Sequence, residues 1–459
     1  MNGSELSPAA LISALIEPLQ LKAGTKLVLA YSGGVDSQVL AAGLAEFANQ
    51  HRQFQYLLVH VHHGLSDNAE IWQQHCEAMA REYDLAIEIK RVDVKQGARV
   101  SLEASAREAR YHALKQTLTR GDVLLTAHHQ DDQLETILLA LKRGLGPKGL
   151  AAMGKVQSFD KRCWLLRPLL DVARSEIETY AETHHISHIE DESNQDNRFD
   201  RNFLRLEVIP ALKSRWPAIA QTATRSAQLC AEQQALIEQE VNARLPAMLV
   251  NTAHASIPAL DLSLLAQQSA LWQAQILRGF IAHIGFEMPS SAQLKQILSQ
   301  LLQAKVDAKV ELKIGTMVLR RFQHCLYVES ELDNLVYRQT KVISLAEVAE
   351  SQSQCWLLDA GVSLLAERHE EGIRLRLPKE TERVSVRFGA TSSLRCHPHF
   401  RDKGRELKKL WQELAVPPWL RCRVPLIYFD DRLVAAVGYW VEKSFLATKN
   451  QPGLVFHLN

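Results

Sequence analysis

A glycine-rich turn near the N-terminus is the first place where residue types and spacing point to chemistry. Residues 29–40 read LAYSGGVDSQVL, in which an apolar run leads into Ser32-Gly33-Gly34-Val35-Asp36-Ser37 and then an amphipathic segment. Glycines let backbone N–H groups approach an anion closely, and the N-terminus of a following helix carries partial positive charge. The serine hydroxyls can donate further hydrogen bonds. The turn is therefore predicted to bind the phosphates of a nucleotide.

The turn lacks the residues of two common nucleotide loops. A Walker loop, GxxxxGK[ST], has a lysine that reaches the β- and γ-phosphates, and a dinucleotide loop needs GxGxxG; neither pattern occurs here. A loop without that lysine suits attack at the α-phosphate of ATP with departure of pyrophosphate, and Asp36 is then a candidate ligand of Mg²⁺. The alternative is a Gly-Gly turn in which Asp36 only caps a helix.

Histidine and acidic residues follow two later apolar runs. These blocks read VHVHHGL at 59–65 and TAHHQDDQLET at 126–136. In the second block, Asp132 and Glu135 can attract an ammonium group and accept its proton, with His128 beside them. Acidic residues at a helix start are also good caps, but capping does not account for the histidines.

A third polar block, SLEASAREARY at 101–111, is predicted to be helical. Glu103, Arg107 and Tyr111 are four residues apart and therefore share one helix face. An ordinary row of helical ion pairs explains the same spacing, so both interpretations stay open.

Alternating strands and helices are expected to position these blocks. Strands are predicted at 26–31, 56–60, 87–92 and 123–126, and helices at 38–50, 69–83, 101–119, 131–142 and 173–184. Strands separated by helices indicate a parallel sheet with right-handed crossovers. Ligands of such sheets bind beyond the carboxyl ends of the strands, where the loop and the histidine blocks would meet. The predicted fold class is α/β, with a doubly wound parallel sheet.

Three domains are predicted along the chain. Residues 1–216 are the catalytic domain, 217–370 a mainly helical middle domain with some strands, and 371–459 a small basic α+β domain. Alternating apolar residues between Lys309 and Val328 indicate hairpins, whereas the segment 340–372 resists assignment.

Bulk composition indicates a globular protein. The 459 residues are 46% hydrophobic and 23% charged, with a formal net charge of +1, so whole-chain charge says nothing about a nucleic-acid partner. We expect no signal peptide and no membrane span. The 7 cysteines are scattered without a CxxC pair, which favours reduced thiols in the cytoplasm and disfavours zinc or iron–sulfur sites.

Clustered basic residues make RNA the expected macromolecular partner. After the acidic run IEDESNQD come Arg201 and Arg205, and the C-terminal module has basic residues interleaved with Trp411 and Trp419. The cations predicted to contact RNA there are Arg405, Lys408, Lys409 and Arg421. A solvated helix face or a basic protein-binding surface are the alternatives.

The ordered blocks resemble the tRNA(Ile)-lysidine synthetase family of PP-loop ATP pyrophosphatases. SGGVDS, VHHGL, LEASAREARY, AHHQDDQLET, RPLLDVARSEI and DESNQDNRFDRNFLR follow the family's order, and GRELKKLWQELAVPPWLRCRVPL resembles its C-terminal domain. The middle helical region resembles the family only in its general helical character and not in a sequence motif. The family often has a basic residue near position 66, where this chain has Ser66.

The resemblance implies an adenine nucleotide α-hydrolase fold and a ligase reaction. The family uses ATP and Mg²⁺ to attach L-lysine to C2 of the wobble cytidine of tRNA(Ile) with anticodon CAU, through an adenylated base. Ser32 to Ser37, Val35 included, would hold ATP. Asp132 and Glu135 would bind the lysine amine, His128 and Arg107 would stabilise phosphate charge, and Glu103 and Tyr111 would orient lysine or cytidine. The oligomeric state stays open, with a homodimer as one option.

Three other functions compete with this interpretation. A tRNA thiolase of the same ATPase group would need a sulfur-carrying cysteine or cluster near the loop, and an amidotransferase would need a glutaminase domain. An RNA-binding protein with a degenerate ATPase fold would not retain both SGGVDS and HHQDDQLET.

Overall fold

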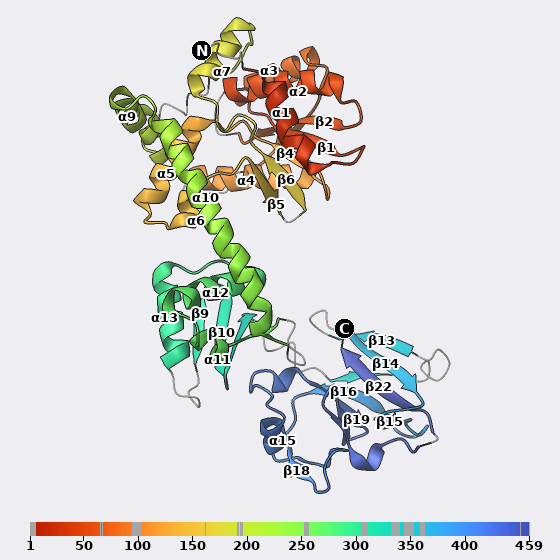
Figure 1. Cartoon of the computed structure of the whole chain (residues 1–459). Coiled ribbons are helices and arrows are strands. Elements are labelled where there is room, and N and C mark those ends of the chain that lie inside the picture. The colour runs from red at the N-terminus through yellow and green to blue at the C-terminus, as the bar shows by residue number, and fades with distance from the viewer. Residues whose placement is uncertain are drawn as a thin grey trace. The chain divides into compact units, whose positions relative to one another are not determined.

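The computed structural model consists of two compact units, Met1–Ile237 and Glu238–Asn459 (Figure 1). The residues that it describes are 6–64, 66, 68–93, 102–160, 162–190, 192, 196–251, 257–303, 310–331, 340–343, 353–358, 363–449 and 451–458. Among them no helix is long and apolar enough to cross a membrane. All seven cysteines are free thiols.

The first unit is built on a six-stranded sheet of order β3-β2-β1-β4-β6-β5. The strands are β1 (Lys26–Ala30), β2 (Gln55–His62), β3 (Ala86–Arg91), β4 (Val123–Leu125), β5 (Val156–Phe159) and β6 (Cys163–Leu166). All neighbouring pairs are parallel except β5 with β6, which form an antiparallel edge. The predicted parallel sheet is confirmed. The β5–β6 hairpin was not anticipated, because an edge hairpin leaves only a short and partly exposed alternation.

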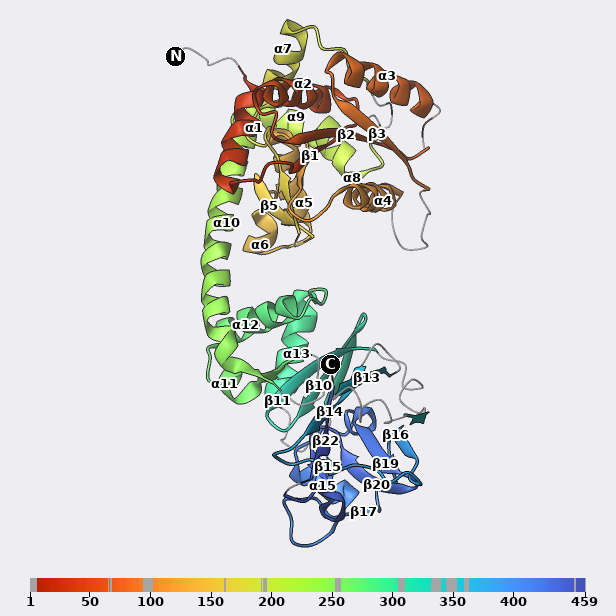
Figure 2. The same ribbon diagram turned by 90° about the vertical axis from the view of Figure 1, so that its right-hand side faces the viewer.

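Helices cover both faces of this sheet, as the alternation along β1 requires. Leu27 and Leu29 pack in a core with α1 (Pro8–Ile16), α2 (Val35–Gln50), α3 (Ala69–Glu82) and α7 (Arg174–Thr183). Val28 points the other way and packs against Leu114 of α4 (Leu102–Thr117). Figure 2 shows α2 and α3 on one side of the sheet and α4 on the other. The fold is therefore doubly wound.

The chain order of the strands fixes where a ligand can bind. β1 lies between β2 and β4, so the crossovers run in opposite directions on its two sides. In open α/β sheets the crevice beyond the carboxyl ends at such a switch point is the ligand site. The turn after β1 and the histidine block after β4 both lie at this point. Helix α5 (Gln130–Lys142) begins within that block, directly after His129.

Short helices complete the first unit and lead out of it. They are α6 (Pro147–Leu150), α8 (Asp200–Phe203), the π-helical turn η3 (Leu204–Val208) and α9 (Ile209–Arg215). The 26-residue helix α10 (Ile219–Arg244) follows and continues into the second unit.

The second unit begins with helices packed on an antiparallel sheet of order β7-β8-β11-β10-β9. Its main helices are α12 (Ala270–His283) and α13 (Ser291–Gln303), with the short α11 (Leu262–Ala266). Its strands are β7 (Leu249–Val250), β8 (Ala259–Asp261), β9 (Glu311–Ile314), β10 (Met317–Phe322) and β11 (Cys325–Ser330). The hairpins predicted between Lys309 and Val328 are confirmed.

The C-terminal part is richer in strands than expected. One sheet joins β12 (Lys341–Val342), β16 (Val384–Phe388), β19 (Pro425–Phe429), β20 (Arg432–Ala436) and β21 (Trp440–Val441). A second joins β13 (Ser353–Leu357), β14 (Ser363–His369), β22 (Gly453–Leu458) and β15 (Leu375–Arg376), and β17 (Arg395–Cys396) pairs with β18 (Arg405–Glu406). The helix α15 (Leu407–Glu413) begins directly after β18, because residues 405–406 pair with β17.

Candidate active site

The turn after β1 forms an anion-binding cradle at the N-terminus of α2. The Ser37 hydroxyl accepts a hydrogen bond from the Gly33 N–H at 3.0 Å and donates one to the Gly34 carbonyl at 2.9 Å, and the Ser32 hydroxyl lies 3.1 Å from it. Gly34 is the N-cap of α2, and no side chain caps the helix there. The helix N-terminus is thus left to an external anion, as a phosphate-binding loop requires.

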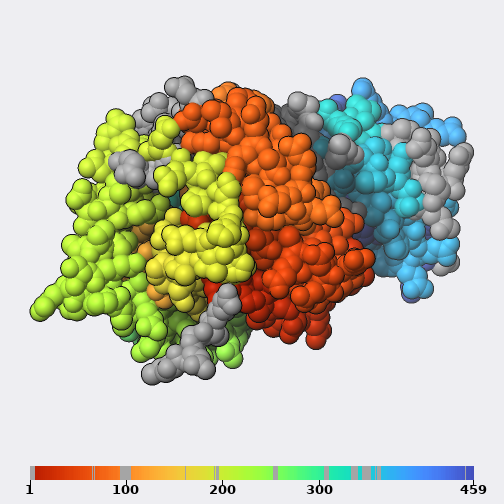
Figure 3. All heavy atoms as spheres, turned by 90° about the horizontal axis from the view of Figure 1, so that it is seen from above, coloured from red at the N-terminus to blue at the C-terminus, as the bar shows by residue number. Residues whose placement is uncertain are grey.

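Gly33 is required by both conformation and space. Its φ of +87° lies in the region that glycine tolerates at least cost. A Cβ there would lie 2.4 Å from Cδ1 of Ile189 and 2.9 Å from the sulfur of Cys76. The Ile189 N–H also donates a 3.0 Å hydrogen bond to the Gly33 carbonyl. Figure 3 shows the yellow segment that includes α7 against the red N-terminal region. The stretch after α7 supports the loop through this hydrogen bond of Ile189.

Asp36 has one carboxylate oxygen in an ion pair and one without a hydrogen bond. Its Oδ2 lies 2.5 Å from the guanidinium of Arg174, and Nε2 of His129 lies 3.8 Å from its Oδ1. The Oδ1 atom is buried and has no hydrogen-bond partner among the described residues. A buried, unbonded carboxylate oxygen beside a phosphate loop fits Mg²⁺, which proteins commonly hold through one or two carboxylates plus substrate phosphates.

An open cavity of about 250 Å³ lies at the carboxyl ends of β1, β2 and β4. Of the residues singled out from the sequence, those that line it are Ser32, Asp36, Ser37, His60, His62, His63, Tyr111 and His128. Trp72 and Arg110 line it as well, although sequence patterns gave no reason to choose them. The predicted convergence of the loop with both histidine blocks is therefore present, and the lining residues combine one guanidinium, several imidazoles and one carboxylate.

The two histidines after β4 have different surroundings. His128 faces the cavity, and its Nδ1 lies 2.9 Å from the Thr126 hydroxyl. Burial, together with nearby arginines and against the attraction of Asp132, lowers the pKa of His128 to about 3, so its imidazole is neutral near pH 7. A neutral imidazole can donate one hydrogen bond to a phosphate oxygen but adds no positive charge.

His129, which the sequence did not single out, bridges the two key carboxylates. Its Nδ1 accepts a hydrogen bond from the Asp131 N–H, so Nε2 carries the proton of the neutral ring. That nitrogen lies 3.5 Å from Asp132 and 3.8 Å from Asp36. His129 is buried, and the adjacent-histidine pattern could not indicate which of the two rings points inward.

Asp132 and Glu135 are brought together by α5, but Arg205 already pairs with both. Arg205 lies 2.9 Å from Glu135 and 3.2 Å from Asp132, and Arg201 lies 3.8 Å from Glu135. Burial tends to raise the pKa of Asp132, yet His129, His128 and Arg205 lower it overall. Burial raises the pKa of Glu135 in spite of Arg205, and Glu135 has no exposed surface.

Of the predicted helix face, Tyr111 lines the same cavity, whereas Arg107 is not among its lining residues. The guanidinium of Arg107 lies over the Tyr111 ring, 5.1 Å from its centroid. Glu103 lies in α4, but its side chain falls outside the part of the chain that the structure describes. Ser66, in the loop after β2, accepts a hydrogen bond from the Asn68 N–H.

The basic residues of the C-terminal part divide into paired and exposed ones. Arg405 lies 2.8 Å from Glu413, Lys409 lies 3.5 Å from Glu406, and Arg421 donates to the Val416 carbonyl. Lys408 is exposed on α15. Local acids therefore orient part of this surface rather than leaving a uniform row of cations.

The two tryptophans that are interleaved with these cations pack against protein. Trp411 is buried in the core beneath α15. Trp419 packs edge-on against Tyr327 of β11, and Arg320 of β10 lies 5.3 Å above its ring. Beside them Glu329 lies 2.7 Å from Arg423. The PPWLR stretch thus joins the C-terminal part to the preceding sheet, which spacing alone could not reveal.

Family models match three stretches of the chain. A PP-loop domain matches residues 8–212, a TilS substrate binding domain 260–327, and a TilS substrate C-terminal domain 384–458.

Curated relatives match over nearly the full length. The tRNA(Ile)-lysidine synthase of Shewanella woodyi is 53% identical over 100% of this chain and 98% of its own, and that of Shewanella oneidensis is 53% identical over 97% of both. The enzyme of the same name from Proteus mirabilis is 41% identical over 94% of this chain and 95% of its own. Among solved structures, a U34-tRNA thiolase from Methanococcus maripaludis aligns with 49% of this chain and 78% of its own at 17% identity and a TM-score of 0.41.

Proposed function

The chain belongs to the tRNA(Ile)-lysidine synthetase family, and from this premise we propose the reaction and the residue roles that follow. It is an ATP-dependent ligase that forms lysidine on tRNA(Ile). In the proposed reaction L-lysine is joined to C2 of cytidine 34 in the tRNA with anticodon CAU, so that this tRNA reads AUA as isoleucine.

The first step activates the base at the cavity beyond β1 and β4. The C2 oxygen of the cytidine attacks the α-phosphate of ATP, and pyrophosphate leaves while the base becomes adenylated. The Ser32–Ser37 cradle holds the phosphates by its N–H and hydroxyl groups, and Gly33 permits their close approach. We assign to His128 and Arg107 the stabilisation of the negative charge that grows on the α-phosphate, because His128 lines the cavity and Arg107 lies over Tyr111, which lines it too.

Mg²⁺ is proposed to bind at Asp36, whose unbonded Oδ1 supports the assignment. When bound there, the ion would neutralise charge on the departing pyrophosphate. Arg174, which already pairs with the other oxygen of Asp36, keeps that carboxylate oriented.

The second step transfers lysine to the activated base. The ε-amine, once deprotonated, attacks C2, and AMP departs with the original C2 oxygen. Asp132 remains ionised because its pKa is lowered, and so it is suited to bind the lysine ammonium. Glu135, whose pKa is raised, is the better proton acceptor, but Arg205 has to move before a substrate amine can reach it.

The tRNA is proposed to contact basic residues in both units. Arg201 and Arg205 lie beside the acidic pair, where a splayed-out cytidine would enter. Arg405, Lys408, Lys409 and Arg421 would contact RNA phosphates in the C-terminal part. Since tRNA is the substrate, we place the protein in the cytoplasm.

The observation that carries the proposal is the lysine-free Ser-Gly-Gly cradle sharing one cavity with Asp36 and His128. The test is incubation of the protein with ATP, Mg²⁺, labelled lysine and transcripts of tRNA(Ile) and tRNA(Met), which share the CAU anticodon. Label should enter tRNA(Ile) alone, with AMP in equal amount. AMP without lysine in RNA would exclude lysine as the second substrate, and neither product would favour the inactive RNA-binding alternative.

A further inference from the structure

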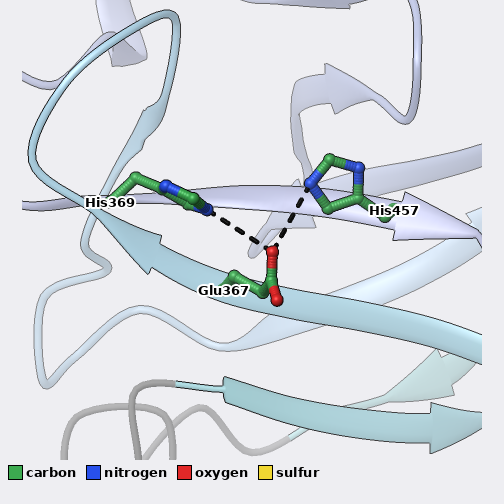
Figure 4. Close-up of side chains that lie close together, drawn as sticks. All are labelled: Glu367, His369 and His457. Carbon is green, nitrogen blue, oxygen red and sulfur yellow. Dashed lines mark hydrogen bonds and ion pairs between the residues drawn. The ribbon is translucent and has the colours of Figure 1, made fainter.

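Three metal-ligating side chains gather on the outward face of the sheet that contains β14 and β22. They are Glu367, His369 and His457, whose ligand atoms all lie within 4.8 Å of one another. Figure 4 shows both imidazoles directed at the Glu367 carboxylate between them. This is the one group of at least three such residues at that spacing in the described part of the chain.

Strand pairing, rather than sequence spacing, brings these residues together. Glu367 and His369 are two apart on β14, so they share one face, and His457 lies opposite Leu365 on the antiparallel neighbour β22. His457 is therefore a diagonal neighbour of Glu367, within reach of long side chains. The two histidines belong to positions 88 residues apart, which is why a search for clustered ligands along the sequence does not find them.

The backbone beneath the group is held in place. β14 pairs with β22 from Leu364 to His369, and β13 pairs with β14 as far as Glu367. On its other side β22 pairs with β15 only at Gly453 and Leu454. The alternate residues on the other face, Leu364, Ala366, Leu454 and Phe456, are buried in a core. The hydrogen bonds between β14 and β22 thus set the spacing of the three outward side chains. Metal binding would therefore carry no entropic cost for ordering the backbone.

The separations are close to those of a bound metal. Oε2 of Glu367 lies 3.4 Å from Nε2 of His369 and 3.8 Å from Nε2 of His457. Ligand atoms of a tetrahedral Zn²⁺ site, at bonds of 2.0–2.1 Å, are about 3.4 Å apart. Side-chain rotations are enough to close the remaining difference. The alternative, a carboxylate shared by two protonated imidazoles, needs charged histidines and no metal.

We propose that Glu367, His369 and His457 form a binding site for a divalent first-row transition metal, Zn²⁺ above all. Two imidazoles and one carboxylate suit Zn²⁺, Co²⁺, Ni²⁺ and Cu²⁺, whereas Mg²⁺ and Ca²⁺ prefer oxygen ligands alone. The side chains are 38–51% exposed, so at least one coordination position faces solvent and takes water or an external oxygen donor. The site is separate from the Mg²⁺ position proposed at Asp36.

The test is titration of the full-length, metal-free protein with Co²⁺, followed by visible absorption, and then displacement by Zn²⁺. The variants are His457→Ala and Glu367→Gln, and the matched control is His324→Ala, which removes an exposed histidine from the turn between β10 and β11. Circular dichroism melts check that each variant folds.

The expected result is one equivalent of bound Co²⁺ that Zn²⁺ displaces and that His324→Ala retains. His457→Ala and Glu367→Gln should each lower the affinity for Co²⁺ at least about tenfold, since loss of a residue that only hydrogen-bonds to a metal ligand already has an effect of that size. The proposal would be overturned if His457→Ala bound Co²⁺ as tightly as the wild type, or if His324→Ala lost as much Co²⁺ affinity as His457→Ala. Because the measured quantity is metal binding, this test does not depend on whether the protein transfers lysine to tRNA.

Discussion

Substitution of Gly33 by alanine tests the proposed loop most sharply. The new Cβ would lie 2.4 Å from Cδ1 of Ile189, although carbon atoms in contact are separated by about 3.5 Å or more, so roughly 1 Å must be opened. The Cβ would also lie 2.9 Å from the sulfur of the fully buried Cys76, so withdrawal of the Ile189 side chain alone does not clear it. Overpacking of this kind costs about 1–3 kcal/mol, and a left-handed conformation adds about 1–2 kcal/mol for alanine.

Gly33→Ala is therefore expected to lower the free energy of unfolding by about 2–5 kcal/mol. The assay is urea denaturation, with tRNA-dependent release of AMP measured in parallel. Gly34→Ala is the matched control, because its Cβ would lie 3.7 Å from the nearest atom at an ordinary φ of −68°. That variant should remain within about 0.5 kcal/mol of the wild type.

A double-mutant cycle separates the steric cause from backbone strain. Ile189→Ala removes both side-chain atoms that the Gly33→Ala methyl would meet at this residue but keeps the Ile189 N–H that bonds to the Gly33 carbonyl. The combined variant should recover about 1 kcal/mol or more relative to additivity. Additive effects, or a Gly33→Ala variant as stable as Gly34→Ala, would refute the steric reasoning.

Three other substitutions have definite expected outcomes. Arg205→Met removes the nearer ion-pair partner of the buried Glu135 and leaves Arg201 at 3.8 Å; urea unfolding should show a loss of about 2 kcal/mol, below the usual range for a buried pair because Arg205 is 41% exposed. Because the pKa of His128 is lowered in the folded state, only the unfolded state binds a proton at this residue between about pH 6.5 and pH 3, and acidification over that range destabilises the fold. Thermal melts of His128→Gln should therefore show a smaller loss of stability over this pH range than those of the wild type. A difference in stability between the two proteins that is the same at every pH in the range would contradict this. Glu329→Gln should lower thermal stability by weakening the ion pair with Arg423, at a free-energy cost of about 1–3 kcal/mol. A melting temperature equal to that of the wild type would show that this ion pair does not stabilise the C-terminal part.

Local patterns predicted what depends on neighbours in sequence. The alternation at Leu27, Val28 and Leu29 identified β1, and the glycines identified the turn after it, because period and backbone freedom are short-range properties. The family resemblance rested on the same short blocks. The position of the cavity also followed, since strand order and helix crossovers constrain where loops meet.

Features that depend on long-range pairing escaped prediction. The choice between His128 and His129 depends on how α5 begins, and the pairing of Arg205 with Glu135 depends on how the segment after α8 returns to the sheet. Trp419 stands among cations in the sequence, which says nothing of its packing partner; β11 supplies that partner, Tyr327, from about a hundred residues earlier.

The central claim is that the C2 oxygen of cytidine 34 leaves as part of AMP. We would prepare tRNA(Ile) with ¹⁸O at that position, run one turnover with ATP and lysine, and analyse AMP and pyrophosphate by mass spectrometry. The account predicts ¹⁸O in AMP in proportion to lysidine formed, and none in pyrophosphate. Lysidine formation with unlabelled AMP would contradict the adenylated-base mechanism and the role assigned to the Ser32–Ser37 loop.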